Sequence, residues 1–353
     1  MMRKMLYNLA TDKYKGVIFL GAKFLLLCLS FIYGLIIRFL IFLSLSDQKR
    51  LNLKVISVGN ITLGGTGKTP LVELISLYLQ KRKIPLAILT RGYKSGGADN
   101  FSDEPKMLAK NLERAFVIVD KDRYRAAKRA SREYGVDTVV LDDGFQQWRI
   151  KKDLEIVVID ARNPFGNRNM LPRGIMREPL SSLRRADIFV LTKVDLACVE
   201  SLARLKKDLI RYQPKALVVE ALYRPVGFYN IKYSDKLLGI EELDRQNKAL
   251  LLSGIADPDS FLYLVRNLGV DITLDLRFPD HHHFTLAELG LIAAKAKERG
   301  IKLIITTDKD ASRFTQDASS LFAGLDVIAL RVELGIVKHE KEFFNRLLSL
   351  YSF

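Results

Sequence analysis

From residue 53 to residue 330, short apolar runs alternate with amphipathic segments rich in lysine and arginine. The runs contain many β-branched side chains, which is typical of buried strands. We predict strands at 53–58, 86–90, 115–119, 137–141, 154–159, 187–191, 216–220, 249–253, 302–306 and 326–330. Buried apolar strands that alternate with helices form a parallel sheet covered on both faces. The pattern therefore predicts an α/β fold, with a parallel sheet flanked by helices.

The alternation is interrupted between residues 222 and 248, where the pattern becomes irregular and polar. A chain of 353 residues is long enough for about two domains. We predict a basic segment with an apolar helix in residues 1–50, a larger α/β domain in residues 51–225, and a smaller C-terminal α/β domain in residues 226–353.

The longest apolar stretch, residues 16–45, precedes the first strand and is interrupted only by Lys23 and Arg38. A cleaved signal peptide is disfavoured, because the stretch is too long and no small-residue cleavage site closes it. As a helix, the residues between the two cations span about 21 Å, whereas the hydrocarbon core of a bilayer is about 30 Å thick. A single span would require both cations to reach the membrane surface.

Basic residues flank this stretch on both sides, with Arg3 and Lys4 before it and Lys49 and Arg50 after it. The positive-inside rule then favours both ends on the same side of a membrane. We predict a monotopic helix that lies in, or dips into, one leaflet. A helix buried against the rest of the protein and a true single span are the two alternatives.

The clearest motif follows the first predicted strand and reads GNITLGGTGKT over residues 59–69. A strand, a glycine-rich loop, Gly-Lys-Thr and a helix together are typical of a phosphate-binding loop, in which backbone N–H groups face an anion. We expect Lys68 to reach the β- and γ-phosphates and the Thr69 hydroxyl to bind Mg²⁺. The residues predicted to contact the nucleotide are Thr62, Leu63, Gly64, Gly65, Thr66, Gly67, Lys68 and Thr69. Thr62 stands where the general pattern has glycine, and an ordinary glycine-rich turn is the alternative.

A second motif predicts a magnesium site beside this loop. Asp142 and Asp143 follow the apolar run at 137–141, and an acid at such a strand end holds Mg²⁺ in phosphate-loop enzymes. The carboxyl ends of parallel strands meet at one edge of the sheet, so we expect these acids to lie near Lys68. A polar Asp-Asp-Gly turn is the alternative. The two motifs together indicate use of a nucleoside triphosphate.

The sequence Thr-Lys-Val-Asp at 192–195 follows the predicted strand 187–191. Many GTPases read guanine with an element of this type, whose acid accepts hydrogen bonds from the base. The element favours a rival hypothesis, in which the chain is a membrane-tethered GTPase or ATPase that acts as a switch. The Asp-x-x-Gly spacing of a GTPase switch does not follow an apolar strand in this sequence.

Asp103 and the histidine tract at 281–283 are ambiguous from the residues alone. Asp103 lies in the sequence Ser-Asp-Glu-Pro, where Ser102 could cap a helix whose dipole favours the acids that follow. The three consecutive histidines are compatible with a metal site, a solvated loop or part of a catalytic site.

The formal net charge is +16, which favours an anionic partner such as nucleic acid, an acidic membrane surface or a phosphorylated substrate. No interleaving of aromatic and basic residues and no known module supports nucleic acid, so we expect none as a partner. Only two cysteines occur, Cys28 and Cys198. They allow neither a disulfide framework nor a Cys-x-x-Cys site, which favours a reducing compartment.

The motifs, taken in order, resemble those of the tetraacyldisaccharide 4′-kinase family of the lipid A pathway in Gram-negative bacteria. They are GNITLGGTGKTP (59–70), LTRGYKS (89–95), SDEP (102–105), LDDGFQQ (141–147), LEIVVIDA (154–161), LPRGIMREPLSSLRRAD (171–187), LTKVD (191–195), SGIADPDSF (253–261), FPDHHHF (278–284) and TTDKDA (306–311). The apolar N-terminal segment also fits this family.

The resemblance implies an enzyme on the cytoplasmic face of the inner membrane. Its fold would be a P-loop NTPase-type domain with a smaller α/β domain closing over the site. ATP and Mg²⁺ would be the cofactors, and the γ-phosphate would pass to the 4′-hydroxyl of a tetraacylated glucosamine disaccharide 1-phosphate. This anionic lipid and the inner-membrane surface would then be the partners that the basic charge serves.

The resemblance also assigns roles to individual residues. Asp103 and a histidine activate the acceptor hydroxyl, and His281 is chosen because it follows Asp280 as in the family motif. The implied catalytic residues are Asp103, His281, Lys68 and Arg177, and the implied metal site comprises Thr69, Asp142, Asp143, Gln146 and Glu178. The chain departs from the family at Gln147, followed by Trp148, where histidine is frequent.

Overall fold

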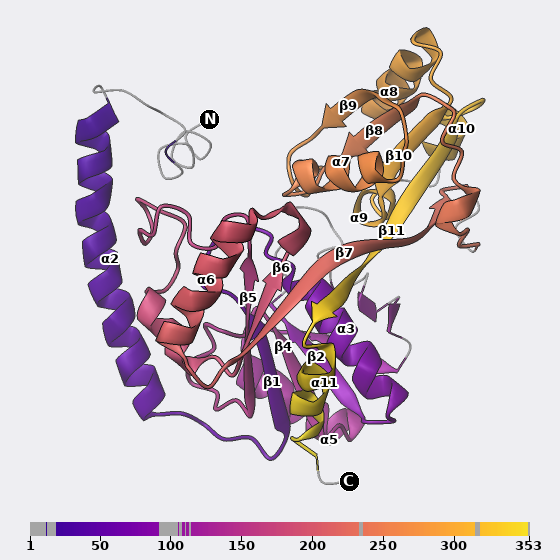
Figure 1. The fold of residues 1–353 in the computed structure, drawn as a ribbon. Coiled ribbons are helices and arrows are strands. Elements are labelled where there is room, and N and C mark those ends of the chain that lie inside the picture. Colours follow the sequence, from indigo (N-terminus) through magenta and orange to yellow (C-terminus); the bar gives the residue numbers. More distant parts are fainter. Residues whose placement is uncertain are drawn as a thin grey trace. The chain divides into compact units, whose positions relative to one another are not determined.

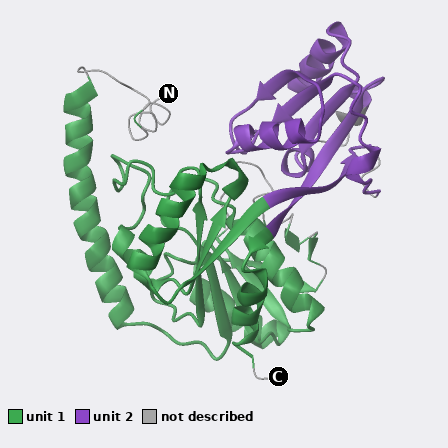
Figure 2. Cartoon of the chain, viewed as in Figure 1, with its two compact units in different colours: residues 1–222, 336–353 green, residues 223–335 purple. Residues whose placement is uncertain are grey.

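The structure, a computed structural model, describes Asp12 and residues 19–91, 105, 108–109, 111–112, 114–232, 236–314 and 318–351. The chain forms two compact units (Figure 2): residues 1–222 with 336–353 make unit 1, and residues 223–335 make unit 2. Two long strands, β7 (Leu217–Asn230) and β11 (Asp326–Lys338), connect them, because each begins in one unit and ends in the other.

Unit 1 is built on a parallel sheet with the strand order β3-β2-β4-β1-β5-β6-β7 (Figure 1). The remaining strands are β1 (Lys54–Gly59), β2 (Leu86–Thr90), β3 (Ala115–Val119), β4 (Thr138–Asp142), β5 (Leu154–Asp160) and β6 (Ile188–Thr192). Central strands β1, β2, β4 and β6 are buried almost throughout, which explains their continuous apolar runs.

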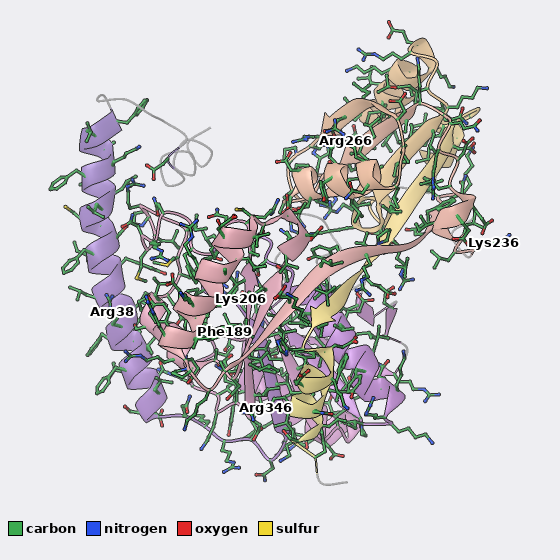
Figure 3. All side chains as sticks on the ribbon, in the orientation of Figure 1. Arg38, Phe189, Lys206, Lys236, Arg266 and Arg346 are labelled. Atoms are coloured by element: carbon green, nitrogen blue, oxygen red, sulfur yellow. The ribbon has the colours of Figure 1, made fainter. Side chains whose placement is uncertain are left out.

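One face of this sheet is covered by α5 (Arg123–Tyr134) and α6 (Val199–Tyr212). Val55 pairs with Val139 in the parallel register, so both side chains point to this face, where they pack with the alanines of α5. The fully buried Phe189 lies in the neighbouring apolar cluster with Leu205 and Leu209 of α6 (Figure 3).

The opposite face is covered by α3 (Lys68–Lys81) and α11 (Glu340–Leu348). Thr138 precedes Val139 in β4 and therefore points to this face, where its Oγ1 lies 2.9 Å from the phenol oxygen of Tyr351. Tyr78 of α3 stacks on Phe344 of α11 with ring centroids 3.8 Å apart. The C-terminal residues thus complete the helical layer of unit 1.

The apolar N-terminal stretch forms one helix of 27 residues, α2 (Leu20–Ser46). In the part of the chain that the structure describes, one helix is long and apolar enough to cross a membrane, and it is α2. Its buried residues are Leu26, Ser30, Gly34 and Ser44. Four phenylalanines are between 61% and 69% exposed: Phe24, Phe31, Phe39 and Phe42. The alternative of a helix buried against the protein is therefore wrong, because only a narrow face of α2 is covered.

Unit 2 is a smaller α/β unit whose strands follow the order β11-β10-β8-β9, all in parallel pairs. Its other elements are β8 (Ala249–Ser253), β9 (Ile272–Arg277), β10 (Leu303–Thr307), α7 (Pro258–Asn267), α8 (Leu286–Glu298), α9 (Asp308–Ala311) and α10 (Ala318–Leu321). Leu250 and Ile304 pack on the α8 side, whereas Leu251 and Ile305 pack on the α7 side.

Exposed cations extend from both units, among them Arg38 and Arg346 on unit 1 and Lys236 and Arg266 on unit 2 (Figure 3).

The predicted fold class is confirmed, and each predicted strand begins within one residue of its predicted start. β9 was not predicted, because its alternating sequence ITLDLR is only half-buried and shows no apolar run. The predicted strands 216–220 and 326–330 are the buried beginnings of β7 and β11, whose later residues are more exposed.

The domain boundaries differ from the prediction in two respects, the first being that α2, predicted in a separate segment of residues 1–50, belongs to unit 1. The predicted border after residue 225 lies close to the observed border after residue 222, but residues 336–353 belong to unit 1 rather than to the smaller domain. The sequence pattern contains no break at residue 336, because β11 continues through the border as one strand.

Candidate active site

The phosphate loop lies between β1 and α3, at the carboxyl edge of the unit 1 sheet. Gly64 and Gly67 have φ angles of 112° and 92°, conformations that residues with side chains rarely adopt. Gly67 is also the N-cap of α3, so the first turn presents backbone N–H groups that are free of intrahelical partners. This is the local structure expected of a site for phosphate.

Two oxygen atoms hold the side chain of Lys68 at this loop. Its Nζ lies 3.2 Å from Oδ1 of Asn60 and 3.4 Å from Oδ1 of Asp143. Asn60 is fully buried, and its side-chain amide donates to the carbonyl of Thr62 at 2.9 Å. Asn60 therefore ties the lysine to the loop, a role that the sequence analysis did not assign to it.

Arg177 and Asp143 form a bidentate ion pair in which the two N–O distances are 3.0 and 2.9 Å. Arg177 also donates to the carbonyl and the side chain of Asn60. Burial tends to raise the pKa of Asp143, but the hydrogen bonds from Arg177 and the charge of Lys68 outweigh it and lower the pKa to about 2. Asp143 is thus a carboxylate at neutral pH, and it pairs with two cations beside the loop.

Glu178 is fully buried and organises the residues behind this pair. Its Oε1 accepts hydrogen bonds from Gln146 (2.9 Å) and Trp148 (3.0 Å). Its Oε2 accepts from Arg185 at 2.8 Å, and the Arg185 guanidinium lies 4.1 Å from the ring centroid of Phe145. Both carboxylate oxygens are therefore engaged by donors from three different side chains.

The end of β6 supports the phosphate loop from the other side. The Thr192 hydroxyl donates to the carbonyl of Thr66 at 2.9 Å. The buried Lys193 donates to the carbonyl of Gly65 at 3.2 Å and to Oδ2 of Asp160 at 2.7 Å. With these loop carbonyls bound on the sheet side, the peptide N–H groups of the loop are available to an anion.

Oxygen atoms suited to Mg²⁺ lie around the same edge of the sheet. Asp142 ends β4 and is 5% exposed, while Thr69 is in the first turn of α3. The amide Oε1 of Gln146 is buried without a hydrogen-bond partner. No group of three or more His, Cys, Asp or Glu side chains with metal-binding potential occurs among the described residues. Kinases bind Mg²⁺ with a few hard oxygen donors from the protein, and the substrate phosphates complete the coordination. The oxygen donors found here fit such a site.

The three consecutive histidines of unit 2 have different surroundings. His282 is held by Glu288, whose oxygens are each 3.2 Å from its Nε2, and its ring lies against Phe278 and Phe284. His283 is exposed. His281 is about half-exposed and adopts a left-handed backbone with φ of 60°. Of the three rings, that of His282 is therefore committed to packing and to the start of α8.

A buried ion pair between Asp310 and Arg313 contacts His281. Asp310 is fully buried and accepts hydrogen bonds from Gly254 N (2.9 Å), the Thr307 hydroxyl (2.7 Å) and Arg313 (3.0 Å). The second terminal nitrogen of Arg313 lies 3.4 Å from Nδ1 of His281. Because arginine can only donate, this contact leaves the proton of a neutral His281 ring on Nε2.

The family model for tetraacyldisaccharide-1-P 4′-kinase matches residues 22–352 of this chain. The chain belongs to this family. It is 34% identical over 346 residues to the tetraacyldisaccharide 4′-kinase of Halothermothrix orenii, covering 89% of each chain. It is 36% identical over 299 residues to that of Anaeromyxobacter dehalogenans, covering 80% of this chain and 78% of the relative. The structure resembles a solved LpxK from Aquifex aeolicus in complex with ATP, with a TM-score of 0.71, 26% identity, and coverage of 94% and 100%.

Membership of this kinase family and its fold, both expected from the motifs, are thereby confirmed. The structure brings five of the predicted site residues into one connected network: Lys68, Asp143, Gln146, Arg177 and Glu178. His281 belongs to unit 2, where Arg313 contacts it. Asp103 lies outside the described residues, so its role in this kinase stays a prediction.

Several polar residues received no role from the sequence, namely Asn60, Trp148 and Arg185 in unit 1 and Arg313 in unit 2, whereas Lys193 was noted only as part of the Thr-Lys-Val-Asp element. Asn60 and Lys193 follow buried strands directly, a position at which polar residues are placed for binding in parallel sheets. That signal was available in the sequence. The partners of Trp148, Arg185 and Arg313 depend on packing, and the local sequence gives no indication of them.

Proposed function

We propose that this chain transfers the γ-phosphoryl group of ATP to the 4′-hydroxyl of a tetraacylated glucosamine disaccharide 1-phosphate. The observation that carries the proposal is the network of Lys68, Asp143 and Arg177 at the phosphate loop of a chain that belongs to this family. The Halothermothrix and Anaeromyxobacter relatives are named tetraacyldisaccharide 4′-kinase, and the solved LpxK is in complex with ATP.

Phosphoryl transfer depends mainly on positioning and on compensation of the charge that develops on the transferred group. Lys68 and Arg177 provide two cations for this purpose, and Asp143 holds them in place at the loop. Oxygens of Thr69, Asp142, Asp143 and Gln146 would hold Mg²⁺, which would supply further positive charge to the phosphates. Glu178 was predicted as a further metal ligand, but in this proposal it fixes the orientation of Gln146, because it is fully buried and accepts hydrogen bonds from Gln146, Trp148 and Arg185.

The acceptor hydroxyl requires a base, and we assign this role to Asp103 with His281 as its partner. A sugar hydroxyl has a high pKa, so the carboxylate accepts the proton late, as the new P–O bond forms. A contribution of about 10²- to 10⁴-fold is typical of such a base. Asp103→Ala should therefore lower kcat by that factor with little change in the KM for ATP, and a kcat equal to that of the wild type would refute the assignment.

The decisive experiment supplies γ-labelled ATP and the acylated disaccharide 1-phosphate and locates the label. We expect label at the 4′ position, its loss in Lys68→Met, and its retention in Lys206→Met, which removes a lysine paired with Glu220 away from the loop. Rapid release of inorganic phosphate without acceptor, together with a preference for GTP, would support the switch hypothesis instead.

We further propose that the chain is a monotopic protein of the cytoplasmic face of the inner membrane. The exposed phenylalanines of α2 offer apolar surface to the acyl region, and each basic residue near an anionic surface adds about 1 kcal/mol. Replacing Phe31 and Phe39 by serine should reduce co-sedimentation with vesicles of anionic lipid. Unchanged recovery on the vesicles would contradict this placement.

A further inference from the structure

Residues 170–177, which we call the bracing segment, run beside the beginning of the phosphate loop. The Leu63 N–H donates to the carbonyl of Ile175 at 2.7 Å, and the Arg177 N–H donates to the carbonyl of Ile61 at 2.7 Å. Between these two bonds, Thr62 and Met176 form an antiparallel bridge. The bracing segment therefore fixes the backbone of the loop and also carries Arg177 into the phosphate site.

The other side of the bracing segment is hydrogen-bonded to α2. The Ser30 hydroxyl lies 2.8 Å from the Met170 carbonyl and 2.9 Å from the Leu26 carbonyl of its own helix, and it accepts from the Arg173 N–H at 2.8 Å. The Tyr33 hydroxyl donates to the carbonyl of Arg177 at 3.1 Å. These bonds join an apolar helix to the segment that frames the nucleotide site.

The two faces of α2 are thus chemically different. Ser30 and Gly34 are buried on the face that meets unit 1, and a Cβ added at Gly34 would come within 3.3 Å of the Met170 sulfur. The large aromatic side chains lie on exposed positions of the same helix. A helix that served only as a membrane anchor would need an apolar surface and no more. The inner face of α2 instead makes specific hydrogen bonds and close packing contacts with the bracing segment. Figure 1 shows α2 lying along one flank of the rest of unit 1.

We propose that α2 is a positioning element of the phosphate site, in which Tyr33 and Ser30 hold the bracing segment and thereby set Arg177 and the loop. The link is direct, because Tyr33 binds the backbone of the same residue whose side chain holds Asp143 and Asn60. A shift of this carbonyl would move the guanidinium, and a shift of the segment would move the loop that is bonded to it. The inference rests on the proposed phosphoryl transfer for its kinetic readout only.

The test uses the full-length chain with Tyr33→Phe and Ser30→Ala. The first variant keeps the ring and removes one hydrogen bond, and the second removes the hydroxyl that accepts from the Arg173 N–H. We expect kcat to fall by roughly three- to tenfold and ATP affinity to weaken, the range given by loss of one hydrogen bond. Membrane recovery should not change, because neither residue lies on the exposed face of α2.

Two matched controls separate positioning from general destabilisation. Ser46→Ala removes an exposed hydroxyl that bonds only within α2, to the carbonyl of Phe42 at 3.0 Å. Ser349→Ala removes an exposed hydroxyl at the end of α11 that bonds to the carbonyl of Arg346 at 2.8 Å. Both should retain the kcat and the ATP affinity of the wild type. Tyr33→Phe values equal to those of these controls would overturn the proposal.

A double-mutant cycle with Arg177→Ala decides whether Tyr33 acts through Arg177. If it does, Tyr33→Phe has little further effect on kcat in the Arg177→Ala background, whereas multiplied losses would show independent action and contradict the proposed link. ATP affinity is measured with a fluorescent nucleotide and without acceptor. If the acceptor assignment were wrong, this binding readout would still respond to Tyr33→Phe, so the two failures are distinguishable.

Discussion

At the scale of single residues, Asp143 combines a left-handed backbone with ion pairs to two cations of the site. Its φ angle of 55° lies in the left-handed region, which disfavours residues with a Cβ. The bidentate pair with Arg177 and the nearby charge of Lys68 keep it there as a carboxylate. The site therefore has its two cations in place before any phosphate arrives, which reduces the reorganisation that catalysis requires.

We predict that Asp143 makes the stability of the protein depend on acid pH. Its pKa is lowered from 3.8 to about 2 in the folded state, so its contribution is complete above pH 4 and is lost as pH falls through 2. This shift corresponds to roughly 2 kcal/mol. Urea unfolding should show Asp143→Asn less stable than wild type by about this amount at pH 6, with the gap narrowing towards pH 2.5. A gap that stayed constant over that range would contradict the role of the carboxylate.

At the scale of elements, the phosphate loop is held from three directions. α3 begins at its end, β6 binds its carbonyls through Thr192 and Lys193, and the bracing segment pairs with its start. These three contacts fix the backbone of the loop, so its remaining N–H groups can face a bound phosphate. Glycine at position 67 makes this possible, because the loop has to turn into the helix through a left-handed residue.

We predict that Gly67→Ala and Gly135→Ala have equal effects on stability but different effects on nucleotide binding. Both glycines adopt left-handed backbones, with φ of 92° and 60°, and alanine in that region costs about 1 to 2 kcal/mol. Gly135 ends α5, with open space around an added Cβ. Thermal unfolding should show similar losses for both variants, whereas ATP binding by calorimetry should weaken only in Gly67→Ala. Equal ATP affinities in the two variants would exclude a special role for the loop backbone.

At the scale of the whole molecule, the chain leaves unit 1 through β7 and returns through β11 to end in α11. Phe343 and Leu347 of α11 are fully buried, so the last residues are part of the core of unit 1. Unit 2 is therefore an insertion between two segments of unit 1.

We predict that two buried phenylalanines report on different units. Phe343 lies in unit 1 and Phe322 in unit 2, and neither side chain is exposed. Replacement by alanine costs about 3 to 5 kcal/mol at such sites. Hydrogen exchange should accelerate in α3 and β4 for Phe343→Ala and in β8 and β10 for Phe322→Ala. Faster exchange in unit 2 for Phe343→Ala would support the predicted domain of residues 226–353 instead.

Local sequence was enough to predict most strands, because a continuous apolar run marks a buried parallel strand wherever the chain later packs. It was not enough for β9, whose alternating ITLDLR pattern reflects a half-buried edge. The same contrast holds for the polar residues of each unit. Lys68 and the Asp142–Asp143 pair follow from motif spacing, whereas the Glu178 cluster and the Arg313 contact with His281 join residues whose proximity depends on packing.

The sequence by itself determined the α/β alternation, the phosphate loop and the family. Each of these depends on short stretches of residues, and the local geometry of such stretches is set by residue type and spacing. The tertiary structure alone decided which distant groups become partners: Tyr33 with the backbone of Arg177, Lys193 with the loop, and residues 336–353 with unit 1. The physical reason is that hydrogen bonds act over about 3 Å. Whether two such groups come that close depends on how every helix and strand between them packs.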